Sequence, residues 1–367
     1  MSNPPEAPAR PGDPIAAIRT PALVVDLDLF EANVARMAAH ADRLGVALRA
    51  HAKTHKSADI GRAQVAAGAV GLCCQKLSEA EALVDEGLDD ILIANQVVGA
   101  ARIERLVALS RRARIAVCVD HPGQVAALVA AGAEIEVLVE LDCGSNRCGT
   151  TPEGAVALAR MIEDAPGLRF GGLQSYYGRA QHIYDPDERA RALEVSIALT
   201  ARVRDAIRAE GIACDRVTGA GTGTFGIEGA SGVYTEIQAG SYVFMDADYN
   251  RVRDGNGAPG GFTQSLYVLA TVISTGPGRA VCDAGLKASS PDSGLPQVAS
   301  PEGITLRGLS DEHGTLDDPE ARLGLDDRVW LIPGHCDPTV NLHDWYVGIR
   351  GGAVETVWPV TARGRLY

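Results

Sequence analysis

The sequence has few aromatic residues, few lysines and no long apolar run. Aromatic residues make up only 5% of the 367 positions, whereas glycine alone occupies 41. The core must therefore be built from Ala, Val, Leu and Ile packed against closely approaching backbone, which suits an alternating α/β architecture. No uninterrupted apolar stretch approaches the ~20 residues of a membrane-spanning helix, so we expect no membrane partner.

Positive charge is also scarce. The 47 acidic residues outnumber the 34 basic ones and give a formal net charge of −13. This balance argues against a partner that is held mainly through phosphate contacts, so we expect no nucleic acid. The rest of the composition, 46% hydrophobic and 22% charged, is that of a folded globular protein rather than a disordered chain.

Cysteine pairs of the CxxC type are absent. The eight cysteines are scattered through apolar segments, which predicts reduced thiols in the core rather than a disulfide framework. Residues 1–13 are rich in proline and polar residues and contain no apolar signal-peptide core. We therefore expect a cytoplasmic protein.

Short apolar runs alternate with amphipathic, alanine-rich stretches over the first two thirds of the chain. This alternation predicts parallel strands with right-handed crossovers, and eight such units favour a closed (β/α)8 barrel of the TIM type over an open doubly wound sheet. The predicted helices include 30–44, 78–86, 101–112, 155–163 and 188–210. The predicted barrel strands are 23–27, 46–50, 69–74, 91–94, 115–119, 137–141, 170–174 and 216–218.

The pattern changes near Gly255. Strand-like runs follow at 266–272, 328–331, 345–349 and 354–358, separated by Gly, Pro and Asp turns and almost without helical periodicity. We expect a barrel domain over residues 21–254 and an all-β domain over residues 255–367. The N-terminal segment 1–20 is expected to pack with the β domain.

Lysine chemistry has only four candidates, which are Lys53, Lys56, Lys76 and Lys287. Lys53 ends the predicted strand V-A-L-R-A-H-A-K, at the barrel face where catalytic loops gather. We expect the low dielectric of the barrel mouth to lower the pKa of this amine and make it available as a nucleophile. The alternative is an ordinary solvated loop lysine.

The segment 218–224 reads T-G-A-G-T-G-T and follows the last predicted barrel strand. Its glycines would let backbone amides approach a phosphate group, and its threonine hydroxyls would add donors. The alternative is a plain tight turn. A Rossmann dinucleotide site is disfavoured, because no GxGxxG follows the first strand.

The stretch P-G-H-C-D-P-T contains residue types that bind metals. In an extended segment His335 and Asp337 point to one side and Cys336 points away, so the imidazole and the carboxylate would share a divalent cation. A polar turn with one core histidine is the alternative. His182 and Arg147 follow two predicted barrel strands and offer a base and a fixed donor fork; each could also be a simple loop residue.

Segments spread over nearly the whole chain together resemble one family. They run from T-P-A-L-V-V-D-L at Thr20 through R-A-H-A-K-T-H-K, G-L-C-C-Q-K-L-S-E-A, G-A-G-T-G-T and Q-A-G-S-Y-V-F-M-D to D-A-G-L-K, S-D-E-H-G and P-G-H-C-D-P-T. Their order and spacing resemble the D-threonine aldolase and 3-hydroxy-D-aspartate aldolase family, which is related to D-serine dehydratase. The resemblance implies a pyridoxal 5′-phosphate (PLP) barrel of the alanine-racemase type (PLP fold type III), a C-terminal β domain and a homodimer.

The same resemblance implies roles for particular residues. Lys53 is implied as the Schiff-base lysine and His182 as the general base, while His335 and Asp337 match the divalent metal pair in the β domain. The ring side of the cofactor is implied to contact Gln75, Arg147 and Tyr176, and the phosphate side Thr222, Gly223, Gly240, Ser241 and Tyr242. One departure is Gly219-Ala220-Gly221, where relatives often carry three consecutive glycines.

The implied activity is a retro-aldol cleavage of a small D-3-hydroxy-α-amino acid to glycine and an aldehyde. D-Threonine is the leading substrate class, and 3-hydroxy-D-aspartate, which would give glyoxylate, is the alternative. The related dehydratases usually carry a cysteine at the position of Asp337; the harder carboxylate favours manganese or magnesium over zinc and an aldolase over a D-serine dehydratase. A racemase, a non-catalytic PLP-binding protein and a nicotinamide oxidoreductase fit less well.

Overall fold

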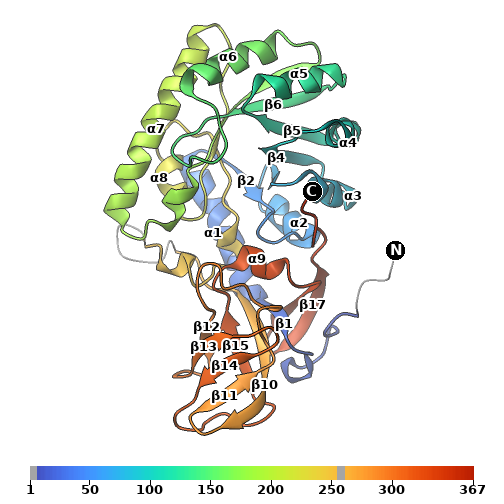
Figure 1. The fold of residues 1–367 in the computed structure, drawn as a ribbon, viewed down its shortest axis with the longest axis vertical. Helices are drawn as coiled ribbons and strands as arrows, with labels where there is room; N and C mark the ends of the chain where they lie inside the picture. Colours follow the sequence, from blue (N-terminus) through green and yellow to red (C-terminus); the bar gives the residue numbers. More distant parts are fainter. Residues whose placement is uncertain (1–5, 254–260) are drawn as a thin grey trace.

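The computed structural model describes residues 6–253 and 261–367 and contains a closed parallel barrel with a strand-rich sheet below it (Figure 1). Gly255, near which the sequence pattern changes, lies outside the described residues. The eight barrel strands are β2 (Ala47–His51), β3 (Gly71–Cys74), β4 (Asp90–Gln96), β5 (Arg114–Val119), β6 (Ile135–Glu140), β7 (Leu168–Ser175), β8 (Val217–Gly219) and β9 (Glu236–Ile237). The predicted barrel fold is therefore confirmed.

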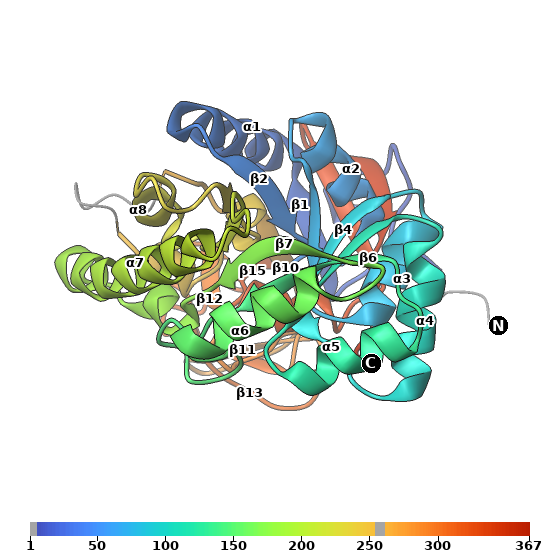
Figure 2. The same ribbon diagram turned by 90° about the horizontal axis from the view of Figure 1, so that it is seen from above.

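Helices cover the outside of the barrel (Figure 2). They are α1 (Leu27–Leu44), α2 (Ala58–Ala66), α3 (Leu77–Asp85), α4 (Ala100–Ser110), α5 (Pro122–Ala130), α6 (Pro152–Glu163), α7 (Pro186–Ala209) and α8 (Phe225–Gly229). In α1 the buried residues recur at helical spacing, Asp26 caps the N-terminus by accepting from the amide of Leu29, and Gly45 ends the helix in the left-handed conformation.

The second sheet has nine strands. They are β1 (Ala22–Asp26), β10 (Leu266–Gly276), β11 (Arg279–Cys282), β12 (Gln297–Ser300), β13 (Thr305–Leu309), β14 (Gly314–Asp317), β15 (Arg328–Ile332), β16 (Trp345–Arg350) and β17 (Ala353–Pro359). The N-terminal segment runs along its edge, where the amide of Gly12 donates to the carbonyl of Val354. The described chain contains no helix long and apolar enough to cross a membrane.

One strand assignment from the sequence is wrong. The run 23–27, predicted as the first barrel strand, overlaps β1, which pairs with β10 and β16 in the second sheet. The barrel is closed instead by β9, between β8 and β2. A central strand buried on both faces reads as the same continuous apolar run in either sheet, and a two-residue strand leaves no periodicity to detect.

The second sheet closes over the barrel end where β2 and β3 finish. The hydroxyl of Tyr346 in β16 donates to the carbonyl of His55 at 2.7 Å, and its ring lies 5.6 Å from that of Phe244. The short helix α9 (Cys336–Val340) lies between the two parts (Figure 1). All eight cysteines are free thiols, and seven of them are buried. Residues from both parts therefore meet at the carboxyl ends of the barrel strands, where TIM-barrel active sites form.

Candidate active site

Lys53 lies two residues beyond the end of β2 and points toward the second sheet. Its ammonium group contacts the carboxylate of Asp337 at the start of α9. Burial favours the neutral amine, but the charge of Asp337 and, to a smaller degree, Tyr176 outweigh it, so the pKa of Lys53 is raised. The expectation of a lowered pKa was wrong, because it considered the dielectric of the barrel mouth without this carboxylate.

Four of the predicted residues line one cavity of about 430 Å³, a volume suited to a small ligand. Lys53, Gln75, Arg147 and Tyr176 all come from loops that follow barrel strands. The guanidinium of Arg147 lies 5.8 Å from the centroid of the Tyr176 ring, within reach of a cation–π interaction. The structure therefore brings together the residues predicted for the ring side of the cofactor.

His51 is a residue of this cavity that the sequence analysis missed. It is the last residue of β2, and its Nε2 lies 3.1 Å from Nε2 of Gln75. Burial, followed by the nearby charge of Lys53, holds the pKa of His51 well below its usual value. A neutral imidazole therefore faces the cavity beside the candidate amine.

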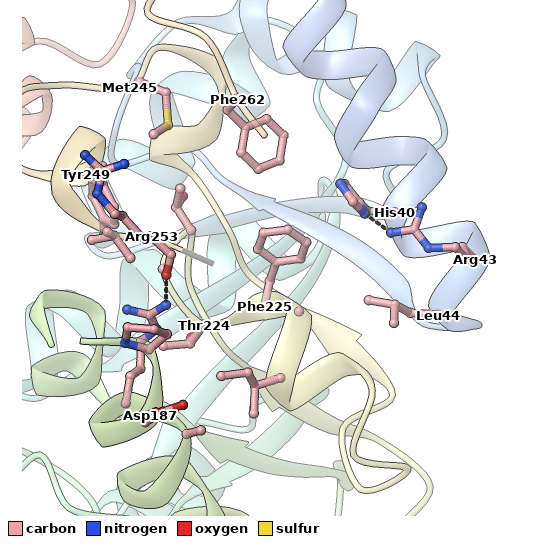
Figure 3. Close-up of a pocket in the computed structure, with 18 residues that line it drawn as sticks. His40, Arg43, Leu44, Asp187, Thr224, Phe225, Met245, Tyr249, Arg253 and Phe262 are labelled. Carbon is pink, nitrogen blue, oxygen red and sulfur yellow. Dashed lines mark hydrogen bonds between the residues drawn. The ribbon is translucent and has the colours of Figure 1, made fainter. Parts of the chain in front are cut away.

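A second cavity of about 470 Å³ adjoins the glycine-rich loop (Figure 3). Thr222 and Gly223 line it, together with Phe225, Met245 and Phe262, whose side chains surround the space in Figure 3. Two of the five candidates for the phosphate side thus line a different cavity from the candidates for the ring side. The two cavities share no lining residue.

The glycine-rich loop folds around the side chain of Gln181. A Cβ at Gly221 would lie 2.5 Å from Oε1 of Gln181, so a larger residue there would displace this buried amide, and the amide of Gly223 donates to the same oxygen at 3.0 Å. The hydroxyl of Thr222 accepts from the amide of Tyr242. At Ala220, between the two glycines of the loop, the backbone has φ 64°, a left-handed conformation that costs an alanine about 1–2 kcal/mol.

The segment 240–242 approaches the loop after β2. A Cβ at Gly240 would lie 2.7 Å from Oγ1 of Thr54, so this position requires glycine. The hydroxyl of Ser241 lies 3.4 Å from that of Thr54 and 3.5 Å from Oδ1 of Asp337. Tyr242 is fully buried and its hydroxyl accepts from Gln64, so its side chain serves the core. Glycine backbone and small hydroxyl groups therefore gather on one side of Lys53.

His182 ends the short 3-10 helix η2 (Gly178–His182) and is half-exposed. Its Nδ1 lies 2.6 Å from Oδ2 of Asp248, a residue that the sequence analysis did not single out. The hydrogen bond to Asp248 raises the pKa of His182, against a smaller opposing effect of burial. The histidine therefore has the partner that a general base in an enzyme usually has.

The segment around His335 is not extended as predicted. The backbone is extended at His335 itself, but helix α9 begins at the next residue, Cys336. The amide of Cys336 donates to the buried carboxylate of Asp246. Nδ1 of His335 lies 2.8 Å from Oδ2 of Asp292. Burial disfavours the charged form of Asp337, but the charges of Lys53 and His335 outweigh this effect and lower its pKa well below the usual range.

Cys336 lies between His335 and Asp337 in the sequence and is fully buried. Burial, with smaller effects of Asp246 and Asp337, holds the pKa of its thiol well above the usual value. Its Sγ lies 3.5 Å from Oδ1 of Asp337, as a donor to the carboxylate. It is therefore a neutral thiol that supports Asp337. Within the described ranges no group of three or more His, Cys, Asp or Glu side chains could hold a metal ion.

Comparisons with known proteins match both parts of the chain. Residues 25–248 match the alanine racemase N-terminal domain, and residues 265–349 match the putative serine dehydratase domain. The chain is 46% identical to 3-hydroxy-D-aspartate aldolase of Paracoccus denitrificans over 99% of this chain and 96% of that protein. It is 47% identical to D-threonine aldolase of an Arthrobacter species over 97% of this chain and 96% of that protein.

Solved structures agree with the sequence matches. D-Threonine aldolase from Filomicrobium marinum superposes with a TM-score of 0.96 at 47% identity, over 98% of this chain and 100% of that one. A more distant structure is a D-threo-3-hydroxyaspartate dehydratase variant with a cysteine replaced by alanine, in the metal-free form; it has 29% identity and a TM-score of 0.84 over 95% and 98% of the two chains.

The chain belongs to the family of D-threonine aldolase and 3-hydroxy-D-aspartate aldolase, within the proteins that carry the alanine racemase N-terminal domain. The relatives at 46% and 47% identity are aldolases, and the protein is an enzyme of the carbon–carbon lyase class. Its fold is that of the PLP-type barrel with a separate strand-rich domain.

The residues present fit PLP. Lys53 supplies an amine at the carboxyl end of a barrel strand, beside a cavity lined by Arg147 and Tyr176. On the other side, Gly240 packs directly against Thr54, and the hydroxyls of Thr54 and Ser241 lie 3.4 Å apart as small donors. An amine, an aromatic face with a cation, and small donors are the groups that an aldehyde, a pyridine ring and a phosphate require.

Proposed function

We propose that the protein is a PLP- and divalent-metal-dependent aldolase that cleaves D-3-hydroxy-α-amino acids of the D-threonine class to glycine and an aldehyde. The observation that carries the proposal is the convergence of an amine, a paired histidine and an imidazole–carboxylate pair at one end of the barrel, contributed by Lys53, His182, His335 and Asp337. The high identity to named aldolases over nearly the whole chain supports it.

Lys53 is the residue that binds PLP covalently. The neighbouring Arg147, Tyr176 and Gln75 hold the ring side, and the phosphate side is held by Thr222, Gly223, Gly240, Ser241 and the backbone of Tyr242. When bound, PLP supplies an electron sink for the electron pair that is released when the bond between Cα and Cβ breaks. The pairing of Lys53 with Asp337 keeps the amine at the barrel mouth, because the carboxylate stabilises the partly buried ammonium group.

His182 acts as the general base. Its half-exposed ring takes the proton of the substrate 3-hydroxyl, and the electrons left on that oxygen form the aldehyde carbonyl as the carbon–carbon bond breaks. Asp248 stabilises the imidazolium that results, since its carboxylate lies 2.6 Å from Nδ1. The proton then has a charged partner rather than apolar surroundings.

His335 and Asp337 are the residues that hold the divalent cation. Nδ1 of His335 faces the carboxylate of Asp292, and Nε2 has no hydrogen-bond partner among the residues that the structure describes. A carboxylate behind a ligating imidazole is the usual arrangement at metal sites in proteins. A divalent cation there supplies a Lewis acid, and a donor set of one nitrogen and one hard carboxylate suits manganese or magnesium.

3-Hydroxy-D-aspartate is the alternative substrate. Lys76 lines the same cavity as Lys53 and Arg147, and it forms no ion pair with any described residue. A second carboxylate on the substrate would find a cation there, and a relative that is named as the aldolase for this compound is 46% identical. Cleavage would give glycine and glyoxylate.

The decisive experiment incubates the purified protein, PLP and manganese with D-threonine, with D-3-hydroxyaspartate and with D-serine. Glycine, aldehyde and pyruvate are then assayed separately. Glycine with an equal amount of aldehyde is expected, from D-threonine if it is the substrate and from D-3-hydroxyaspartate if the alternative holds. Pyruvate from D-serine without glycine would instead identify a dehydratase.

The base is tested by replacing His182 with alanine. The variant should retain the absorbance of bound PLP and its metal affinity but lose roughly 10²- to 10⁴-fold in aldol cleavage, the usual contribution of a general base. Near-normal turnover would assign the proton transfer to another group.

The assembly and the compartment belong to the same proposal. The family resemblance supports a homodimer, which light scattering of the purified protein would measure, and the eight free cysteines support a reducing, cytoplasmic compartment.

A further inference from the structure

A buried carboxylate gathers three donors beside the candidate base. The side chain of Asp248 is only 4% exposed, and it accepts from Nδ1 of His182 at 2.6 Å, from the hydroxyl of Tyr184 at 2.6 Å and from Nη2 of Arg251 at 2.5 Å. These residues come from two segments more than 60 residues apart, η2 with the turn after it and the 3-10 helix η4 (Tyr249–Arg251). The cluster is thus formed by the tertiary fold.

We propose that Asp248 is the positioning residue of the base: it holds the proton of the neutral His182 ring on Nδ1 and leaves Nε2 as the atom that accepts the proton of the substrate hydroxyl. The inference rests on the proposed role of His182. It adds to that role the identity of the accepting atom and the residue that determines it.

The chemistry of the carboxylate determines the tautomer. An ionised carboxylate can only accept hydrogen bonds, so a neutral imidazole facing it at 2.6 Å must present a proton on Nδ1. Asp248 stays ionised, because burial is outweighed by the hydrogen bonds from His182, Tyr184 and Arg251, which lower its pKa well below the usual range. With Nδ1 occupied, only the lone pair on Nε2 is free to take a proton.

The surroundings also restrict the orientation of the ring. The ring of Tyr249 packs against His182 with centroids 6.0 Å apart and an interplanar angle of 39°. On the other side of Asp248, the guanidinium of Arg251 lies 4.3 Å from the centroid of the Tyr184 ring. The carboxylate is therefore held by Arg251 and Tyr184 while it directs the histidine, the arrangement of a base oriented by a third group.

The charged groups around His182 shift its pKa in both directions. Asp248 and Asp246 raise the pKa of His182, and Lys53 lowers it. Tyr184 and Arg251 contact the far side of Asp248 rather than the histidine itself. Replacing Asp248 by asparagine removes the nearest negative charge and allows an amide N–H to donate to Nδ1, so the variant should change both the tautomer and the titration of His182.

The direct test uses NMR on the full chain labelled with ring-¹³C histidine and saturated with PLP, so it does not depend on turnover. The His182→Gln variant assigns the signals of His182, and the ring carbon shifts report the tautomer and the titration midpoint. We expect the Nδ1–H tautomer in the wild type. In Asp248→Asn we expect a mixture or the Nε2–H tautomer, and a midpoint at lower pH.

Tyr184→Phe is the matched control, because it removes one hydrogen bond to the same carboxylate and keeps the charge. It should preserve the Nδ1–H tautomer. If Asp248→Asn leaves the tautomer and the midpoint of His182 unchanged while the circular dichroism spectrum shows a folded protein, Asp248 does not position the base. An Nε2–H tautomer in the wild type would overturn the inference equally.

The kinetic test separates this inference from the proposed function. Asp248→Asn should lower kcat by about 10²-fold or more, within the ~10²- to 10⁴-fold range of a general base, and move the acidic limb of the pH profile of kcat/KM to lower pH. If the tautomer changes but kcat does not, Asp248 has no catalytic role. If His182→Gln is itself fully active, the base step of the proposed function fails whatever the NMR result.

Discussion

A buried ion pair between Lys56 and Glu79 joins the two loops that carry the cavity residues. Nζ of Lys56 lies 3.2 Å from Oε1 of Glu79, and the two side chains are 8% and 0% exposed. Oε2 of Glu79 also accepts from the amide of Gln75 at 2.8 Å. Lys56 follows Lys53 in the turn after β2, and Glu79 lies in the first turn of α3, which follows β3. The pair therefore ties the candidate amine to the candidate ring contact.

Replacing Lys56 by methionine should be strongly destabilising. The substitution leaves Glu79 as a buried carboxylate without its cation, and breaking a buried pair in this way costs about 3–5 kcal/mol. The double variant Lys56→Met with Glu79→Gln keeps an acceptor for the amide of Gln75 and removes the unpaired charge. It should recover at least ~2 kcal/mol of the loss, because replacing both charges of a buried pair is often close to neutral.

Urea unfolding followed by circular dichroism measures both variants, and titration with PLP measures whether the cavity survives. Lys287→Met is the control, since Lys287 and Glu312 form an exposed pair, 67% and 59% exposed, of the kind worth ~0–1 kcal/mol. The reasoning is refuted if Lys56→Met costs no more than the control, or if the double variant is as unstable as the sum of its two single substitutions.

Three other predictions follow from the site and its surroundings. Borohydride reduction of the PLP-loaded protein and peptide mapping should label Lys53; a label on any other lysine would contradict the assignment. Chelation should abolish cleavage reversibly without loss of the PLP absorbance, and Asp337→Ala should raise the manganese concentration needed far more than Cys336→Ala, whereas the opposite order would point to a thiolate metal site. Burial, opposed by smaller hydrogen-bond effects, lowers the pKa of His55 from 6.5 to about 4. The unfolded chain therefore binds a proton at His55 at a higher pH than the folded protein does. The free energy of unfolding should be highest above pH 6.5 and should fall by about 3 kcal/mol as the pH drops toward 4. His55→Gln should reduce that slope in urea unfolding between pH 7 and 4, and an unchanged slope would exclude His55 as its source.

The barrel was predictable because its helices repeat their apolar residues at the helical period over many turns. The predicted stretch 30–44 lies within α1, and 188–210 overlaps α7 almost completely. The sheet partners of short strands were not predictable in the same way. β1 and β9 were assigned wrongly or missed, since pairing depends on which distant segment supplies the neighbouring hydrogen bonds.

The candidate residues could be located from strand ends, but their partners could not. The sequence analysis singled out His182 without Asp248 and His335 without Asp292, which lie 66 and 43 residues away. Both partners are acidic residues in polar loop segments, where aspartate is common and carries no pattern of its own. The same limit explains the error in the sign of the pKa shift of Lys53, whose carboxylate partner is 284 residues distant.

These separations have a consequence for how the site forms. Lys53 belongs to the barrel, whereas Asp337 and His335 enter with α9 from the second part of the chain. The ion pair between Lys53 and Asp337 therefore exists only when the second sheet is docked, through contacts such as that of Tyr346 with the carbonyl of His55. Without that docking, the ammonium group of Lys53 would lose the carboxylate that stabilises its charged form. The second domain thus contributes the carboxylate partner of the amine as well as the candidate metal ligands.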